Sequence, residues 1–193
     1  MQRRIVYRPR KLNKNIEKLI NKATKEMQDE TEKQYVAVHS AMTIALYRFW
    51  NFRKDRIAKI YRSCEQIWDE CGSDREMSMI RKCDEECDIE LTNQEGTSYR
   101  NIQWLNDSKI NEIHSDYEFL VFRQNQKKWT KAQMMASVCL SMHRAEGWGF
   151  KRLSELMIRI EDILEEYNYN PEKLCNVAHD ECGSDYIQVA EVV

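Results

Sequence analysis

Two basic clusters that contain aromatic side chains are the residues of this sequence best suited to molecular recognition. They occupy residues 50–56 and 147–152. Guanidinium groups form paired hydrogen bonds with carboxylates and phosphates, and aromatic rings fill pockets or stack on bases. This composition predicts non-covalent binding to a partner. The candidate partner-binding residues are Trp50, Phe52, Arg53, Lys54, Arg56, Trp148, Phe150, Lys151 and Arg152.

Arg56 and Arg152 are each expected near the start of a helix, where a cation opposes the helix macrodipole. Two explanations fit this placement. The guanidinium group forms an ion pair with an acid of a neighbouring helix, or it contacts a phosphate or carboxylate of a partner. The sequence leaves both open.

The N-terminal stretch is a second candidate for binding, with nucleic acid as its ligand. Residues 1–25 hold nine Lys or Arg against one Glu, and a compact cationic arm of this kind can contact phosphates. The sequence pI of about 6.1 and two acidic stretches, 65–95 and 155–193, oppose binding to a duplex. The candidate nucleic-acid-binding residues are Arg3, Arg4, Arg8, Arg10, Lys11 and Lys14.

Metal and catalytic chemistry have weaker support in the sequence. Two groups of soft metal ligands exist, namely Cys175, His179 and Cys182, and Cys64, Cys71, Cys83 and Cys87. Their spacings match helical faces better than short zinc knuckles, which favours buried thiols over a metal site. No phosphate-binding glycine loop and no nucleophile signature occurs. We therefore expect no metal, no cofactor and no enzymatic activity.

The elements that position these residues are expected to be helices. Only five Gly and two Pro interrupt 193 residues, and 32% of the residues are charged. Apolar residues recur with helical spacing along residues 35–49, 57–68 and 153–164. The sequence predicts an all-α fold.

One stretch of the chain occurs twice. Residues 39–71 align without a gap on residues 135–167 at an offset of 96, so that Met42 meets Val138 and Arg56 meets Arg152. Each copy predicts a helix, a tight aromatic turn and a second helix. Because such a pair cannot bury both apolar faces alone, we expect an irregular multi-helix bundle with an internal pseudo-duplication. A loop signal at 92–98 divides the chain into halves 1–95 and 96–193.

The second turn reads EGWGFKRL at residues 146–153, and it resembles the F-G-F-G-x-x-R-L turn of small helical proteins from prophages and mobile elements of Gram-positive gut bacteria. The first turn reads WNFRKDRI and departs from this pattern, with Asn51 and Arg53 in place of the glycines. The resemblance implies a phage or mobile-element origin. Accessory proteins from this source include inhibitors of bacterial defence enzymes, anti-CRISPR proteins among them.

Taken together, these features favour a non-catalytic interaction protein, with an anti-CRISPR-like inhibitor of a nucleic-acid-targeting defence nuclease as the most concrete function. The acidic stretches would occupy a basic nucleic-acid channel of that partner. The alternative is a DNA- or RNA-binding accessory protein that uses the N-terminal arm. No apolar signal-peptide region and no run of 18 apolar residues occurs, so we expect a location in the bacterial cytoplasm and no membrane contact.

Overall fold

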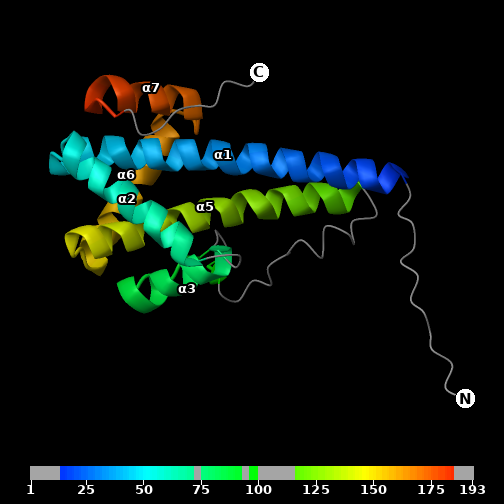
Figure 1. The fold of residues 1–193 in the computed structure, drawn as a ribbon, viewed down its shortest axis with the longest axis horizontal. Coiled ribbons are helices and arrows are strands. Elements are labelled where there is room, and N and C mark those ends of the chain that lie inside the picture. Colours follow the sequence, from blue (N-terminus) through cyan, green and yellow to red (C-terminus); the bar gives the residue numbers. More distant parts are fainter. Residues whose placement is uncertain (1–13, 72–74, 93–95, 100–115, 185–193) are drawn as a thin grey trace, which may run out of the picture.

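The computed structural model describes residues 14–71, 75–92, 96–99 and 116–184, which form six helices and no strand (Figure 1). The helices of the first half are α1 (Lys14–Trp50), α2 (Lys54–Cys71) and α3 (Arg75–Cys87). Those of the second half are α5 (Asp116–Glu146), α6 (Phe150–Glu166) and α7 (Pro171–Cys182). The structure confirms the predicted all-α multi-helix fold.

The two longest helices, α1 and α5, lie side by side in the centre and run in the same direction (Figure 1). Residues 36–46 of α1 and residues 132–142 of α5 are buried on every face. A helix that is buried all round needs small or apolar side chains on every face, and these two stretches are rich in Ala, Ser, Val, Met and Leu. They form the centre of the hydrophobic core.

The remaining helices cover this central pair in a crossed arrangement. Helix α2 packs on α5 and α6 packs on α1, while α3 packs on α5 and α7 on α1. Each of the four outer helices thus packs mainly against the central helix that the opposite half supplies. The predicted halves 1–95 and 96–193 therefore share one hydrophobic core.

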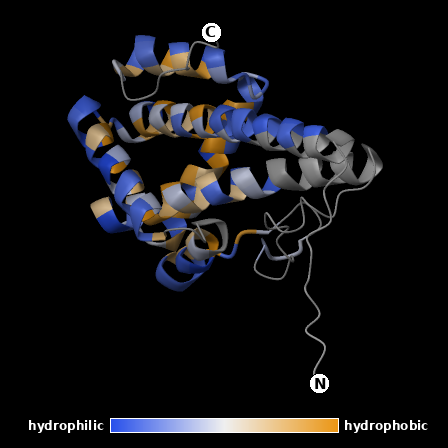
Figure 2. Ribbon diagram, turned by 45° about the vertical axis from the view of Figure 1, so that its right-hand side comes forward, coloured by the Kyte–Doolittle hydropathy of each residue, from blue (hydrophilic) through white to orange (hydrophobic). Residues whose placement is uncertain are grey.

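Amphipathic periodicity explains why the outer helices bury only one face. In α2 the buried residues Ile57, Ile60, Cys64 and Ile67 recur every three or four positions. The equivalent positions of α6, shifted by 96, are also buried. Figure 2 shows hydrophilic and hydrophobic residues alternating along the outer helices, as this pattern requires.

Two arginine-centred ion-pair clusters connect the halves. Arg48 at the end of α1 lies 2.7 Å from Glu181 and 3.5 Å from Glu166. Arg144 at the end of α5 lies 2.7 Å from Glu70. Arg144 also lies 2.8 Å from Glu86. Because Arg48 and Arg144 are 96 positions apart, as are Glu70 and Glu166, each arginine holds an equivalent acid of the opposite half.

These arginines change the titration of their partners. The guanidinium group of Arg144 hydrogen-bonds the Glu70 carboxylate and holds its pKa below the usual range. Arg48 lowers the pKa of Glu181 in the same way. Charge-assisted, multidentate hydrogen bonds of this kind are among the stronger polar contacts of a protein. They fix the ends of α1 and α5 against the outer helices.

His39 is fully buried in the centre of α1. Its Nδ1 donates a hydrogen bond to the Tyr35 carbonyl oxygen at 3.0 Å, and its ring lies 5.8 Å from that of Tyr61. Burial disfavours the charged imidazolium and lowers the pKa of His39 from 6.5 to about 4. The imidazole is therefore neutral in the folded protein at neutral pH.

This burial predicts a pH-dependent stability. The folded-state pKa of His39 is lower than the unfolded-state value. The contribution of the neutral His39 side chain to the free energy of unfolding is therefore complete above pH 6.5 and is lost as pH falls toward 4. The free energy of unfolding should fall by about 2 to 3 kcal/mol between pH 6.5 and 4.5. Urea denaturation at several pH values measures this change.

The matched variant is His39→Met, because Met135 occupies the equivalent position of the second unit. We expect this variant to lose most of the dependence between pH 6.5 and 4.5. The control is His179→Gln, which changes an exposed histidine and should keep the dependence. If the free energy of unfolding of His39→Met depended on pH as strongly as that of the wild type, the assignment of this dependence to His39 would be contradicted.

Candidate partner-binding surface

The two predicted turns follow the same backbone path. Asn51 and Gly147 come directly after α1 and α5, and both have positive φ, 56° and 66°. Each donates its N–H to the carbonyl four residues earlier, Asn51 to Tyr47 at 3.1 Å and Gly147 to His143 at 2.8 Å. This is the left-handed ending that many helices use to satisfy their last carbonyls.

The starts of the second helices also correspond. The carbonyl of Arg53 accepts a hydrogen bond from Ile57 N–H at 3.0 Å, and the carbonyl of Gly149 accepts one from Leu153 N–H at 3.2 Å. Helices α2 and α6 begin 96 positions apart. The two helix–turn–helix units therefore share their local backbone geometry, while their origin by duplication stays an interpretation.

The two turns pack directly against each other at one end of the molecule. The ring of Phe52 meets that of Trp148 edge to face, with 5.8 Å between the ring centres. The ring of Trp50 lies 5.1 Å from Trp148. Phe52 and Trp148 are only 1% and 3% exposed, and Trp50 is half-buried. The aromatic residues thus form the joint between the units.

This burial corrects part of the sequence prediction. Phe52 and Trp148 were expected to contact a partner, but the joint between the two turns covers both rings. Their apolar area is removed from water inside the fold, so they support the surface from below. The sequence could not show this, because it does not reveal that the two turns meet.

Arg56 and Arg152 both lie over these buried rings. The guanidinium carbon of Arg56 is 3.7 Å from the ring centre of Phe52, and that of Arg152 is 5.9 Å from Trp148. Arg56 also donates Nε–H to Glu146 at 3.0 Å. For Arg56, the expected ion pair with an acid of a neighbouring helix is present, and it lowers the pKa of Glu146.

The side chains that remain accessible define the turn-end surface. Arg53, Lys54, Lys151 and Arg152 are exposed, and so are two large apolar rings, Phe150 at 57% and Phe49 at 49%. The turn-end surface comprises Phe49, Arg53, Lys54, Phe150, Lys151 and Arg152.

Phe49 and two other residues were missed by the sequence reasoning. The helical spacing of α1 placed Phe49 in the core, but its ring lies on the surface with the guanidinium group of Arg159 4.6 Å from its centre. Arg48 and Arg144 were also missed as structural residues. Their identity at the offset of 96 was the signal that could have found them.

The structure does not describe the side chains of the predicted nucleic-acid-binding arm. Arg3, Arg4, Arg8, Arg10 and Lys11 lie outside the described residues. Lys14 begins α1, and its side chain is not among those described. The prediction for the arm therefore stays a prediction.

Charges along α2 and α6 run against the helix macrodipole. Residues 54–62 hold four cations and one acid, whereas residues 65–70 hold three acids and no cation. In α6, residues 150–153 hold two cations, and residues 161–166 hold four acids. A macrodipole favours the opposite order by about 0.3–1 kcal/mol for each terminal charge. This order is not the one that helix stability alone would favour.

The thiols have the environment of core residues. Burial raises the pKa of Cys64 to about 11, and that of Cys182 also to about 11. A thiol with such a pKa stays protonated and is a poor nucleophile at neutral pH. Within the described ranges, no group of three or more His, Cys, Asp or Glu side chains is placed to hold a metal ion.

Comparison with known proteins identifies no relative. The chain matches no family model, no curated protein and no solved structure. Among the described helices, none is long and apolar enough to cross a membrane. The function of this chain is therefore inferred from its geometry.

The turn geometry predicts different effects of alanine at two neighbouring glycines. An added Cβ meets no atom within 4 Å at either Gly147 or Gly149, but only Gly147 has positive φ. Gly147→Ala should lower the free energy of unfolding by about 1 kcal/mol through backbone strain. Urea denaturation measures the effect.

Gly149→Ala is the matched control. Gly149 is extended, with φ −96° and ψ 177°, a conformation that alanine adopts freely. This variant should leave the free energy of unfolding nearly unchanged, because the entropic gain from replacing glycine is offset by the preference for glycine over alanine at the N-cap of α6. Equal losses in both variants would show that steric contact, and not backbone conformation, governs the turn.

Proposed function

We propose that this protein is a non-catalytic interaction protein that inhibits a bacterial nucleic-acid-targeting defence nuclease. The observation that carries the proposal is the charge order of α2 and α6, basic at the turn end and acidic at the far end. Both helices adopt this order against their macrodipoles. Some of these charges pair within the fold, as Arg56 does with Glu146 and Glu70 with Arg144. The other exposed charges of α2 and α6, such as Glu65 and Lys151, are suited to a charged partner.

A nuclease offers both kinds of complementary surface. Its nucleic-acid channel is basic because it binds phosphates, and metal-dependent cleavage requires a cluster of carboxylates. Exposed acids such as Glu65 and Asp69 match the channel, and the cations of the turn-end surface match the carboxylates. Charge complementarity of this type steers association and selects the partner.

Two further features support a binding role. Phe150 and Phe49 supply exposed aromatic area at the turn-end surface, and aromatic anchors dominate many protein interfaces. The backbone beneath them is fixed by the Phe52–Trp148 contact and by the turn hydrogen bonds. A surface held in this way loses little conformational entropy on binding.

Co-expression with a panel of CRISPR effector nucleases tests the proposal. The protein should protect a target plasmid from at least one effector and should co-purify with it. The double variant Arg53→Glu/Lys151→Glu should weaken binding by about tenfold or more, because it reverses two exposed turn-end charges. Plasmid survival and the affinity of the purified pair are the readouts.

The control is Arg81→Glu, which reverses an exposed charge on α3 and should keep full protection. Wild-type protein that protects against no effector and retains none on purification contradicts the nuclease proposal. Equal losses in the control and the double variant would contradict the assignment of the turn-end surface.

Direct binding of nucleic acid is the second candidate, because the turn-end surface contains four exposed cations and the exposed ring of Phe150. If these cations contact phosphates, the affinity for labelled DNA or RNA should fall steeply with salt. In the double variant Arg53→Glu/Lys151→Glu, the affinity should fall less steeply as the salt concentration rises. Absence of binding at about 50 mM salt rejects this candidate.

A further inference from the structure

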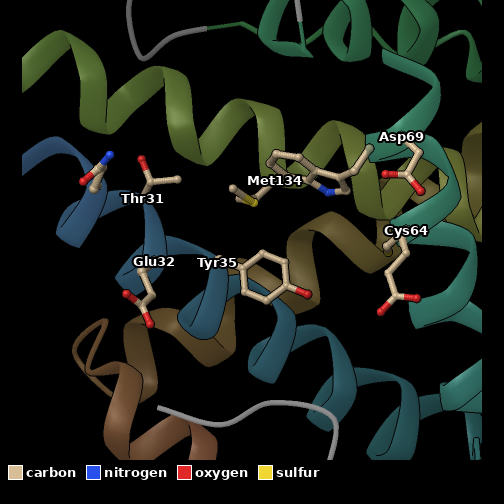
Figure 3. Close-up of a pocket in the computed structure, with 9 residues that line it drawn as sticks. Thr31, Glu32, Tyr35, Cys64, Asp69 and Met134 are labelled. Atoms are coloured by element: carbon tan, nitrogen blue, oxygen red, sulfur yellow. The ribbon is translucent and has the colours of Figure 1, made fainter. Parts of the chain in front are cut away.

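A cavity of about 490 Å³ lies between α1, α2 and α5, in the angle where the two helices of the first unit diverge from their turn. Figure 3 shows Tyr35 reaching from α1 toward α2, with Met134 of α5 beside it. The volume falls within the range of ligand sites in proteins. The cavity is separate from the turn-end surface.

The cavity combines an apolar interior with carboxylates at its edge. Tyr35, Cys64, Trp68 and Met134 contribute apolar and aromatic surface. The exposed acids at its edge are Glu32, Glu65 and Asp69. No ion pair joins any of these three acids to a cation within the described part of the chain. This combination suits a ligand with an apolar body and a positive charge.

A second cavity, of about 400 Å³, lies between α5 and α6, and Leu91, Thr92 and Tyr99, which precede α5 in the chain, also line it. This cavity contains Lys128 at the position that corresponds to Glu32 of the first cavity. Its acids Glu161 and Glu165 are 96 positions from Glu65 and Asp69. Here a lysine of the chain itself enters the site. The Lys131 ammonium lies 2.7 Å from the Glu161 carboxylate and 5.0 Å from the ring centre of Tyr169.

Lys131 corresponds to Tyr35 at the offset of 96, so the first cavity has the acids without the lysine. The second cavity thus shows, within the same protein, that the carboxylate equivalent to Glu65 pairs with an ammonium group. An ammonium group gains from both contacts, because carboxylates pair with it and the ring face attracts it.

We propose that the cavity between α1 and α2 binds a lysine side chain of a partner protein, together with an apolar residue beside it in the partner sequence. The ammonium group pairs with Glu65 and Asp69, and the aliphatic chain packs against Tyr35 and Trp68. A lysine side chain alone is smaller than this cavity, so the neighbouring residue of the partner fills the remaining apolar volume.

The state of Tyr35 agrees with this role. Burial, followed by the nearby Cys64 and the negative charge of Glu65, raises the pKa of Tyr35 to about 12. The hydroxyl group therefore stays protonated at neutral pH and brings no negative charge of its own. Glu65 and Asp69 remain the acids that face the ligand. Glu65 and Asp69 are also the acids assigned above to the basic channel of a nuclease, so the two proposals share these side chains, but lysine binding in the cavity can be tested without a nuclease.

Selection from a displayed library of random dodecapeptides tests the proposal. On the wild-type protein, we expect enrichment of peptides that contain a lysine next to a large apolar residue. The decisive variant is Tyr35→Lys, which places a lysine where the second unit has Lys131. This internal ammonium should occupy the site and reduce the binding of selected peptides at least tenfold.

Binding of one synthetic selected peptide is then measured by the intrinsic fluorescence of the protein, since Trp68 lines the cavity. Replacing the peptide lysine by Nε-acetyl-lysine should reduce its affinity at least tenfold. Glu65→Gln should do the same, whereas Glu155→Gln changes an exposed acid of α6 that lines neither cavity and should bind within about threefold of wild type. Lys131→Tyr should create a second site for the same peptide.

Circular dichroism and thermal melts establish that each variant is folded before binding is compared. Three results overturn the proposal. The first is that no peptide binds the wild type better than it binds folded Tyr35→Lys. The second is that the selected peptides lack a cation, and the third is that the acetylated peptide binds with full affinity. Because none of these measurements involves a nuclease, failure here is distinct from failure of the proposed function.

Discussion

The contact on which the fold depends is the packing of one turn against the other through Phe52 and Trp148. A helix–turn–helix unit whose two helices diverge leaves apolar faces uncovered. When the turns meet edge to face, α1 and α5 are brought side by side in the same direction. The outer helices can then cover the central pair, and the cavities lie in the angles that the units leave open.

Ion pairs fix the arrangement that the aromatic joint allows. Arg48 and Arg144 occupy equivalent positions at the ends of the central helices and hold acids of the opposite half. Partly exposed ion pairs contribute little stability one at a time, typically less than about 1 kcal/mol. Their value here is geometric, because each arginine engages two carboxylates at once and so defines how the halves align.

The two units share a backbone and differ in the side chains that a partner would meet. One turn uses Gly147 where the other uses Asn51, with the same left-handed conformation. One cavity contains Lys131 where the other has Tyr35. Because these differences lie at accessible positions of a shared backbone, the units offer partners different chemistry on the same scaffold.

The amino-acid sequence by itself determined the helices and their buried faces, because helical periodicity is local and few glycines or prolines interrupt it. It also predicted two equivalent units, from an offset of 96 in one alignment. Tertiary structure alone decided that Phe52 and Trp148 are buried, that Phe49 is exposed, and that Arg48 reaches Glu181. The physical reason is that a periodic pattern states which face of a helix avoids water and does not state which helix will cover it. That choice depends on contacts between residues far apart in the chain.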